Sequence, residues 1–475
     1  MTATVASAAP PAPAGIASET SAKAHLFASV AFVGLSIPIG FAALLTLRFP
    51  GMFGSLSFGR LRPAFMIAIC LGALFLSFAG GIYYVLPRVT GAVLQGETLA
   101  RLSLPLSVAV YGAGMGLVLL GFGDGREPFG LPWWLDILVL GTLSVPALVT
   151  FLTLRERIEP RQFPSVWYAV GGTVALPVLY VVGNLPNTTQ VAAALGDRVF
   201  MAGFNAIWVV GVGTGLAYYA VVKTTEQPLA SRNLARIGFW SLMFGAIWQG
   251  PAQLAVGPLP DWVLAVSAFD GLAVVVACLA NATCLALTMG GAWRRRRDHP
   301  AALAAMSGAG LATVWAIVST FSSFRAALAL TDLTLFWEGA TDLVLLGAGG
   351  LFIAAWTYQA LPNLFGRALF STRLALTNIR SFTIGATGLG LFLVLAGIAS
   401  GYGWTGGSNA GAYVSTGAGW DQSAGPAKLM LLLSVIPAAV LGWGTVAFVR
   451  NVLLTYVRGS ATVQEVLVAT GGSDD

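Results

Sequence analysis

The chain has 475 residues, of which 57% are hydrophobic and 9% are charged, and its formal net charge is +6. Together with a mean hydropathy of +0.80, this composition excludes a soluble globular protein and indicates a polytopic membrane protein. Membrane topology explains the excess of positive charge, so neither nucleic acid nor an acidic substrate is required as a partner.

The hydropathy pattern predicts an all-α polytopic bundle of twelve transmembrane helices, because about 20 apolar residues cross a bilayer core of about 30 Å. The twelve apolar stretches are residues 26–47, 64–87, 102–121, 133–154, 165–184, 199–222, 235–256, 262–290, 302–324, 335–361, 381–401 and 429–449. Residues 1–24, rich in Ala, Pro, Ser and Thr, are expected to form a disordered cytoplasmic tail. Residues 25–452 are expected to form the membrane domain and residues 453–475 a second cytoplasmic tail.

The distribution of basic residues predicts that both termini are cytoplasmic, because Lys and Arg near span ends are retained on that side. With this orientation, 18 of the 25 Lys and Arg residues lie in cytoplasmic segments. They are Lys23, Arg88, Arg101, Arg155, Arg157, Arg161, Lys223, Arg232, Arg236, Arg294, Arg295, Arg296, Arg297, Arg367, Arg373, Arg380, Arg450 and Arg458.

The two histidines of the chain, His25 and His299, both lie outside the predicted spans. Haem iron and copper inside a membrane bundle are bound mainly by imidazole nitrogen, so the predicted spans offer no ligand of this kind. Cys70, Cys278 and Cys284 lie inside spans without CxxC spacing. This pattern favours small buried side chains over a redox or metal site.

Several segments carry a family resemblance. The most specific is GLAYYAVVKTTEQPLASRNLARIGFWSLMFGAIWQGPAQLAVGPLPDWV at 215–263. The others are FGRLRP at 58–63, LPWWLDI at 131–137, VWY at 166–168, TDLT at 331–334 and LPNLFGRALFS at 361–371. In these motifs and their order, the chain resembles the catalytic subunit I of C-family (cbb-type) haem-copper oxidases. It resembles the large subunit of bacterial nitric oxide reductases more distantly.

The resemblance implies six histidines that hold a low-spin haem b and a high-spin haem b facing a copper ion. None of the six is present. The corresponding positions are Phe65, Phe204, Ala252, Gln253, Trp337 and Gly339, and the position of a redox-active tyrosine is Ala246. Aromatic rings bury about 150–250 Å² each, so Phe65, Phe204 and Trp337 are expected to fill part of the cofactor volume. We therefore predict neither haem nor copper, and no catalytic residue or metal ligand.

Three acids occur inside spans, where an unpaired charge is costly and indicates a functional site by default. They are Asp270, Glu338 and Asp342, the last two spaced i, i+4 on one helix face. One interpretation is structural, with hydrogen bonds to a neighbouring helix or pairing with Arg62 or Arg325. The other is an ion or proton path.

Three functions remain open at this stage. The first is a cofactor-free, accessory subunit of a respiratory electron-transfer complex in a bacterial inner membrane, assembled with a c-type cytochrome or another redox membrane subunit. The second is a working terminal oxidase or nitric oxide reductase, against which the missing ligands argue. The third is an ion- or proton-coupled transporter that uses the intramembrane acids.

Overall fold

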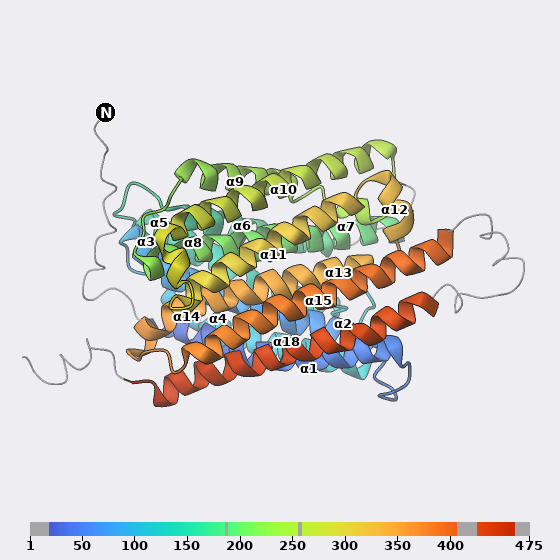
Figure 1. Cartoon of the computed structure of the whole chain (residues 1–475), viewed down its shortest axis with the longest axis horizontal. Helices are drawn as coiled ribbons and strands as arrows, with labels where there is room; N and C mark the ends of the chain where they lie inside the picture. Colours follow the sequence, from blue (N-terminus) through green and yellow to red (C-terminus); the bar gives the residue numbers. More distant parts are fainter. Residues whose placement is uncertain (1–18, 186–188, 255–258, 406–424, 461–475) are drawn as a thin grey trace, which may run out of the picture.

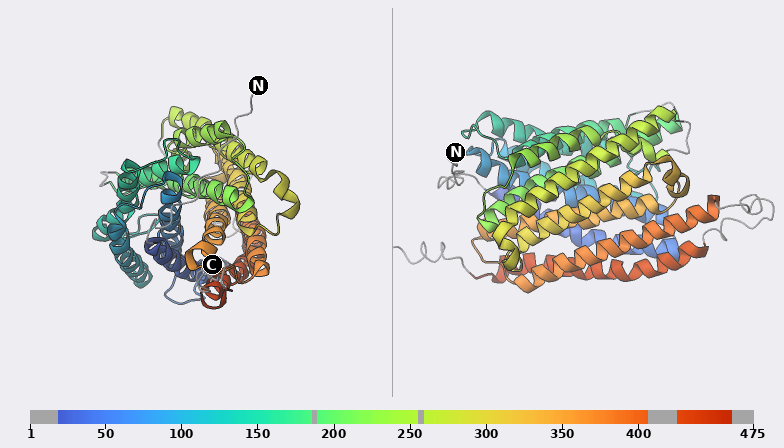
Figure 2. Two further views of the ribbon diagram at one scale, coloured as in Figure 1. Left: turned by 90° about the vertical axis from the view of Figure 1, so that its left-hand side faces the viewer. Right: turned by 45° about the horizontal axis from the view of Figure 1, so that its top comes forward.

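The computed structural model describes residues 19–185, 189–254, 259–405 and 425–460. In these ranges the elements are helical, and the long helices lie side by side along one direction (Figure 1). Seen end-on, successive helices follow one another around the bundle (Figure 2). The circuit closes where α1 packs against α18.

The elements have the following bounds. They are α1 Thr20–Arg48, α2 Phe58–Met66, η1 Ile67–Phe75, α3 Leu76–Thr90, α4 Glu97–Leu120, α5 Trp133–Arg155, α6 Pro164–Gly183, α7 Gln190–Gly203, η2 Phe204–Val212, α8 Gly213–Thr225, α9 Arg232–Gly245, η3 Gly250–Leu254, α10 Asp261–Met289, η4 Gly290–Arg295, α11 Pro300–Ser322, α12 Arg325–Thr331, α13 Phe336–Asp342, η5 Leu343–Gly349, α14 Gly350–Phe365, α15 Thr372–Thr405 and α18 Gly425–Arg458. The segments η1, η2 and η5 are π-helical, whereas η3 and η4 are 3-10 helices.

The predicted polytopic helical fold is confirmed, with one difference in the spans. Eleven helices of the described residues are long and apolar enough to cross a membrane, and they coincide with eleven of the twelve predicted spans. The seventh predicted span, 235–256, is the exception, because α9 ends at Gly245. Its 14 residues rise about 21 Å. A turn and η3 follow α9. The apolar composition of this stretch therefore extends past the end of the helix, and the predicted span is longer than the helix.

Three continuous helical segments form the centre of the bundle, and we call them the core helices. They are 58–90, 190–225 and 336–365, and the most apolar windows of these helices are 100%, 94% and 89% buried. The corresponding windows of the other eight spans are 39–56% buried. Each core helix contains one π-helical segment. Burial on all sides is typical of an inner helix, whereas half-burial is typical of a helix that also faces lipid.

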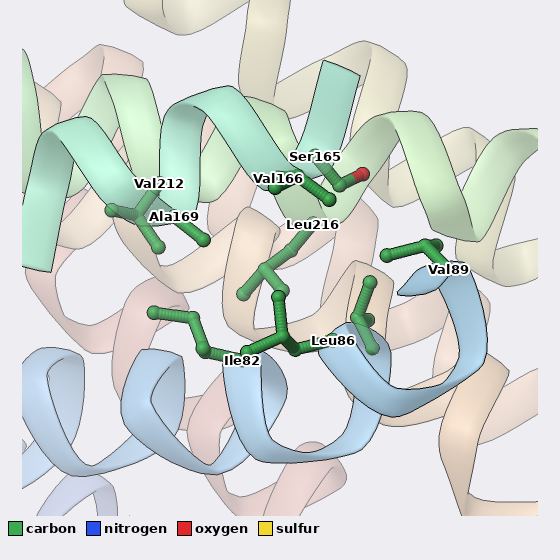
Figure 3. Close-up of a pocket in the computed structure, with 9 residues that line it drawn as sticks. Ile82, Leu86, Val89, Ser165, Val166, Ala169, Val212 and Leu216 are labelled. Carbon is green, nitrogen blue, oxygen red and sulfur yellow. The ribbon is translucent and has the colours of Figure 1, made fainter. Parts of the chain in front are cut away.

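The π-helical segments of the core helices meet at Gly349 in η5. A Cβ atom built on Gly349 would lie 2.6 Å from Leu74 in η1 and 3.1 Å from Val209 in η2. The glycine therefore leaves room for side chains of the other two core helices to pack against the η5 backbone. A cavity between α3, α6 and the η2–α8 segment has a volume of about 10 Å³, close to the minimum for one water molecule. Its wall is mostly aliphatic, and Ile82, Leu216 and Val212 point into it (Figure 3).

The two ends of the bundle carry separate ion pairs, and we name the ends after Arg62 and Arg88. Arg88 pairs with Glu19 at the start of α1. The rings of Phe27 in α1 and Tyr456 in α18 lie 5.2 Å apart. The start of α1 and the end of α18 therefore both lie at the Arg88 end. Both helices extend past the predicted domain boundaries, since α1 begins at Thr20 and α18 ends at Arg458. Residues 1–18 and 461–475 of the predicted tails lie outside the described residues.

The sequence-based prediction that His25 lies outside the membrane helices was wrong. His25 lies inside α1 and is 2% exposed. Its Nδ1 atom lies 2.8 Å from the carbonyl oxygen of Ser21, and its ring packs edge-on against Tyr83. The polar first turn of α1 lowers the local hydropathy, so the hydropathy pattern begins the span after the true start of the helix.

Candidate functional site

The positions that the resemblance singles out on the core helices lie close to their π-helical segments. Phe65 is the last but one residue of α2, two residues before η1 begins, and Phe204 is the first residue of η2. Trp337 and Gly339 belong to α13, which leads into η5. Irregular π winding often marks functional sites in helices.

Phe65 is packed against two neighbours and is 2% exposed. A Cβ atom on Gly40 of α1 would lie 2.8 Å from its ring, so the ring rests directly on the α1 backbone. The Arg62 guanidinium also lies over this ring, 5.2 Å from its centre, within the range of a cation–π contact. A cavity of about 40 Å³ lies beside this ring, lined by Ile37, Gly40, Phe41, Leu44, Arg62, Phe65, Asp342, Leu346, Leu389, Ala438 and Leu441.

Asp342 is the α13 residue that lies beside this cavity with Phe65. Trp337 instead packs in a small separate cluster with Leu328 and Phe336. Gly339 faces α15, because a Cβ atom there would lie 2.8 Å from the carbonyl oxygen of Gly390. The structure therefore brings Phe65 and Asp342 together, and does not bring Trp337 or Gly339 to the same cavity.

Phe204 is fully buried in a cluster of aromatic rings. Its ring centre lies 5.9 Å from that of Phe200, which in turn contacts Tyr180 at 5.4 Å and Phe129 at 5.7 Å. Rings at such separations pack favourably beyond their area of burial. Aromatic side chains from α6, α7 and the loop before α5 therefore occupy this part of the core.

The remaining predicted positions lie at the end of α9 and beyond it. Ala246 caps α9, and Ala252 and Gln253 lie in η3. Ala246 and Ala252 are fully buried, and Gln253 is half-buried. The η3 segment packs on α7, since a Cβ atom on Gly250 would lie 2.5 Å from the carbonyl oxygen of Arg198.

A cluster of three charges links α2 to α13 at the Arg62 end. Arg62 pairs with Glu338, and its Nη1 atom donates a hydrogen bond to Asp342 Oδ1 at 3.0 Å. The side chain of Arg62 is 16% exposed and that of Asp342 is 10% exposed. Pairing offsets the cost of placing these charges away from water. The two acids spaced i, i+4 therefore act together as the partner of Arg62.

The other two predicted polar residues lie elsewhere. Arg325 pairs with Asp261 across 3.6 Å, at a site where both side chains are about four-fifths exposed, so this contact contributes little. Asp270 lies in α10 and is 2% exposed. No ion pair or side-chain hydrogen bond in the described ranges includes Asp270.

The side chains at these positions do not fit haem b or copper with histidine ligands. Haem and copper need imidazole, thiolate or thioether donors aimed at the metal, whereas the core positions hold aromatic, aliphatic and amide groups. The cavity beside Phe65 measures about 40 Å³, room for about three water molecules at 10–15 Å³ each, far less than a porphyrin occupies. In the described residues, no three His, Cys, Asp or Glu side chains are grouped to hold a metal ion.

The profile of the family described as "Cytochrome C and Quinol oxidase polypeptide I" matches residues 20–436. The chain belongs to this family. The match covers all three core helices and the Arg62 cluster. The resemblance inferred from the sequence motifs is therefore confirmed at the level of the haem-copper oxidase subunit I family.

Individual members of the oxidase subunit I family are similar over most of the chain. "Cytochrome c oxidase subunit 1" of Rhodobacter capsulatus is 27% identical over 373 residues, which is 74% of this chain and 69% of the relative. "Cbb3-type cytochrome c oxidase subunit CcoN1" of Stutzerimonas stutzeri is 27% identical over 73% of this chain and 76% of its own length. A solved heme-copper terminal oxidase dimer has the same fold, with a TM-score of 0.75, 13% identity, and 94% and 86% of the two chains covered.

The oxidase-like core also contains a polar cluster that sequence reasoning missed. Asn281 Oδ1 accepts hydrogen bonds from the hydroxyl groups of Tyr168 at 2.7 Å and Tyr218 at 2.9 Å. A Cβ atom on Gly238 would lie 2.0 Å from that oxygen, so the glycine makes room for the amide. The cluster ties α6, α8, α9 and α10 together. Nothing in the spacing of these residues distinguishes them from ordinary span residues.

Proposed function

We propose that this chain is a cofactor-free, oxidase subunit I-like subunit of a respiratory electron-transfer complex, with a structural or accessory role. The observation that carries the proposal is the occupation of the core positions. Phe65 packs onto α1, Phe204 packs among aromatic rings, and Trp337 packs with Leu328 and Phe336. Replacement of ligands by side chains that pack against their neighbours is the pattern of a fold kept for assembly.

We further infer a bacterial cytoplasmic membrane, with the Arg88 end in the cytoplasm. Lys and Arg near span ends are retained on the cytoplasmic side, and most basic residues of the chain lie in the connections at the Arg88 end or in the helix ends next to them. The contact between Phe27 and Tyr456 supports placing both termini on that side. The relatives named above are bacterial, which supports the same type of membrane.

The proposed partner is a c-type cytochrome or another redox membrane subunit. Support comes from the relatives, which are named as subunits of cytochrome c oxidases. An accessory subunit that binds no redox group itself contributes through its contacts, so its assembly is the property to measure.

The test is purification of the tagged chain from its native membranes, in two steps. In a mild detergent, mass spectrometry is expected to find a c-type cytochrome or another redox subunit in stoichiometric amount. After a stronger detergent has separated the partners, the isolated chain is expected to give no b-haem bands in a reduced-minus-oxidised spectrum. A stoichiometric b-type haem on the isolated chain would revive the working oxidase or nitric oxide reductase as the better proposal. A chain that purifies alone in every detergent would contradict the subunit role.

An ion-coupled role is a second candidate, and only one of the three acids favours it. Glu338 and Asp342 are engaged by Arg62. Asp270 is buried, and its Oδ2 atom has no hydrogen-bond partner. A buried acid of this kind is a candidate for binding a proton or a cation.

A further inference from the structure

Asp270 lies at a depth where its charge has to be neutralised. It follows the first residue of α10, Asp261, by about 13 Å at 1.5 Å per residue, and it is 2% exposed. Its Oδ2 atom is buried without a hydrogen-bond partner, and no ion pair of the described ranges includes it. An isolated carboxylate in such a place is strongly unfavourable unless a proton or a cation accompanies it.

Three helices meet around Asp270. A Cβ atom on Gly245, the last residue of α9, would lie 2.5 Å from the carbonyl oxygen of Asp270. A Cβ atom on Gly271 would lie 2.8 Å from Thr320 Oγ1 in α11. The two glycines therefore let α9 and α11 approach α10 at the level of the acid.

Two more polar side chains of this region are buried without partners. Thr320 is 3% exposed and Gln249 is 2% exposed, yet neither the Thr320 hydroxyl nor either atom of the Gln249 amide has a hydrogen-bond partner. Hydroxyls elsewhere in α11 are satisfied by carbonyl oxygens of the preceding turn, at 2.9 Å for Thr313 and 2.8 Å for Ser322. Gln249 follows the end of α9 by one turn and precedes η3, which packs against α7 and α10.

We propose that Asp270, Thr320 and Gln249 form a binding site for a small monovalent cation, with Na⁺ as the best match. A carboxylate, a hydroxyl and an amide offer oxygen ligands, which hard cations prefer. One carboxylate balances one positive charge, so a monovalent ion leaves the site neutral, whereas a divalent ion does not. Bound Na⁺ would also be a partner for Asp270 Oδ2, the Thr320 hydroxyl oxygen and Gln249 Oε1, which have none.

This site is independent of the proposed accessory role. A subunit without redox groups can use a bound ion to hold α9, α10 and α11 together, and an ion-coupled protein can exchange it. Absence of Na⁺ binding would leave the assembly experiment above unaffected.

The experiment measures the thermal midpoint Tm of the purified full-length chain in NaCl and in choline chloride at equal ionic strength, which keeps screening constant. We expect Na⁺ to raise Tm with a saturable dependence on concentration, since a ligand that binds only the folded state stabilises it. Asp270→Asn is expected to abolish this shift. Thr320→Val is expected to raise the half-saturating Na⁺ concentration roughly tenfold, the effect of about 1.4 kcal/mol of lost binding.

Ser267→Ala is the matched control. Ser267 lies on the same buried face of α10, and its hydroxyl is already satisfied by the carbonyl oxygen of Val263 at 3.0 Å. Its Na⁺ dependence is expected to equal that of the unaltered chain. The proposal is overturned if the unaltered chain has the same Tm in both salts, or if Asp270→Asn keeps the full Na⁺ shift. Should Asp270→Asn fail to fold, an unchanged half-saturating concentration in Thr320→Val overturns it equally.

Discussion

Among the residues that the structure describes, Arg62 is the cation paired with both acids of α13, so its removal leaves two carboxylates side by side. We predict that Arg62→Leu lowers the free energy of unfolding by about 2 kcal/mol. This is less than the 3–5 kcal/mol found for fully buried pairs, because the cluster is partly exposed and screened. The second change, Asp342→Leu in the Arg62→Leu background, is expected to restore part of the loss, since it removes one of the unpaired charges. Thermal unfolding in detergent measures both effects.

Arg325→Leu provides the control for the loss of a positive charge. Its pair with Asp261 is largely exposed, so the expected change is within about 0.5 kcal/mol. An equal loss in Arg325→Leu and Arg62→Leu would show that net charge, and not the cluster, determines stability. A double variant with no recovery would contradict the explanation by charge repulsion.

Single residues also show the limits of the sequence-based prediction. Pairing of Glu338 and Asp342 with Arg62 was one of the alternatives that the sequence left open, beside pairing with Arg325 and an ion or proton path, and the structure shows the pairing with Arg62. The sequence did not indicate that Asp342, instead of Trp337 or Gly339, lies beside Phe65, because motif spacing does not fix the rotation of a helix about its axis. The burial of His25 was missed for a different reason, namely that a polar first turn hides the start of α1.

Glycines set the distances between the helical elements, and Gly339 does so where α13 packs against α15. A Cβ atom on Gly339 would lie 2.8 Å from both the Gly390 carbonyl oxygen and the Val394 nitrogen, which are backbone atoms that cannot rotate away. We predict that Gly339→Ala costs about 1–3 kcal/mol, the usual range for overpacking. Loss of Tm in detergent measures this cost.

Gly310→Ala in α11 is the matched control, because a Cβ atom there meets no atom within 4 Å. The same substitution is expected to be neutral or to stabilise α11 by up to about 1 kcal/mol, since Ala has the higher helix propensity. A comparable loss at both positions would mean that the added methyl group acts through something other than the α13–α15 contact.

At the scale of elements, hydropathy predicted eleven of the twelve spans correctly, because in these eleven the apolar stretch and the helix coincide. It failed for residues 235–256, where Ile247 and Trp248 keep the composition apolar although Gly245 ends the helix and Pro251 follows. Apolar turns at the end of a span and apolar helices have the same composition, so hydropathy cannot separate them. The π-helical segments η1, η2 and η5 were missed likewise, because they arise from packing between core helices and carry no composition of their own.

The whole molecule keeps its fold while its core positions differ from those that the family resemblance implies. The core helices remain buried because aromatic rings and glycine contacts fill the space between them, as at Phe204 and Gly349. Tight packing of this kind supplies stability to a membrane bundle. Under the proposed accessory role, the outer helix faces are the surfaces that contact other subunits.

The proposed orientation of the molecule in the membrane can be tested by labelling introduced cysteines, because the native cysteines are not expected to react. Cys70, Cys278 and Cys284 are free and buried, so a membrane-impermeant maleimide is expected to leave the unaltered chain unlabelled. Glu127 lies at the Arg62 end with its side chain 65% exposed, and Arg296 is exposed in the segment after η4 at the Arg88 end. In intact spheroplasts, Glu127→Cys is expected to react and Arg296→Cys is not, whereas both are expected to react after permeabilisation. The reverse pattern would place the basic Arg88 end outside, against the charge rule that predicts it inside.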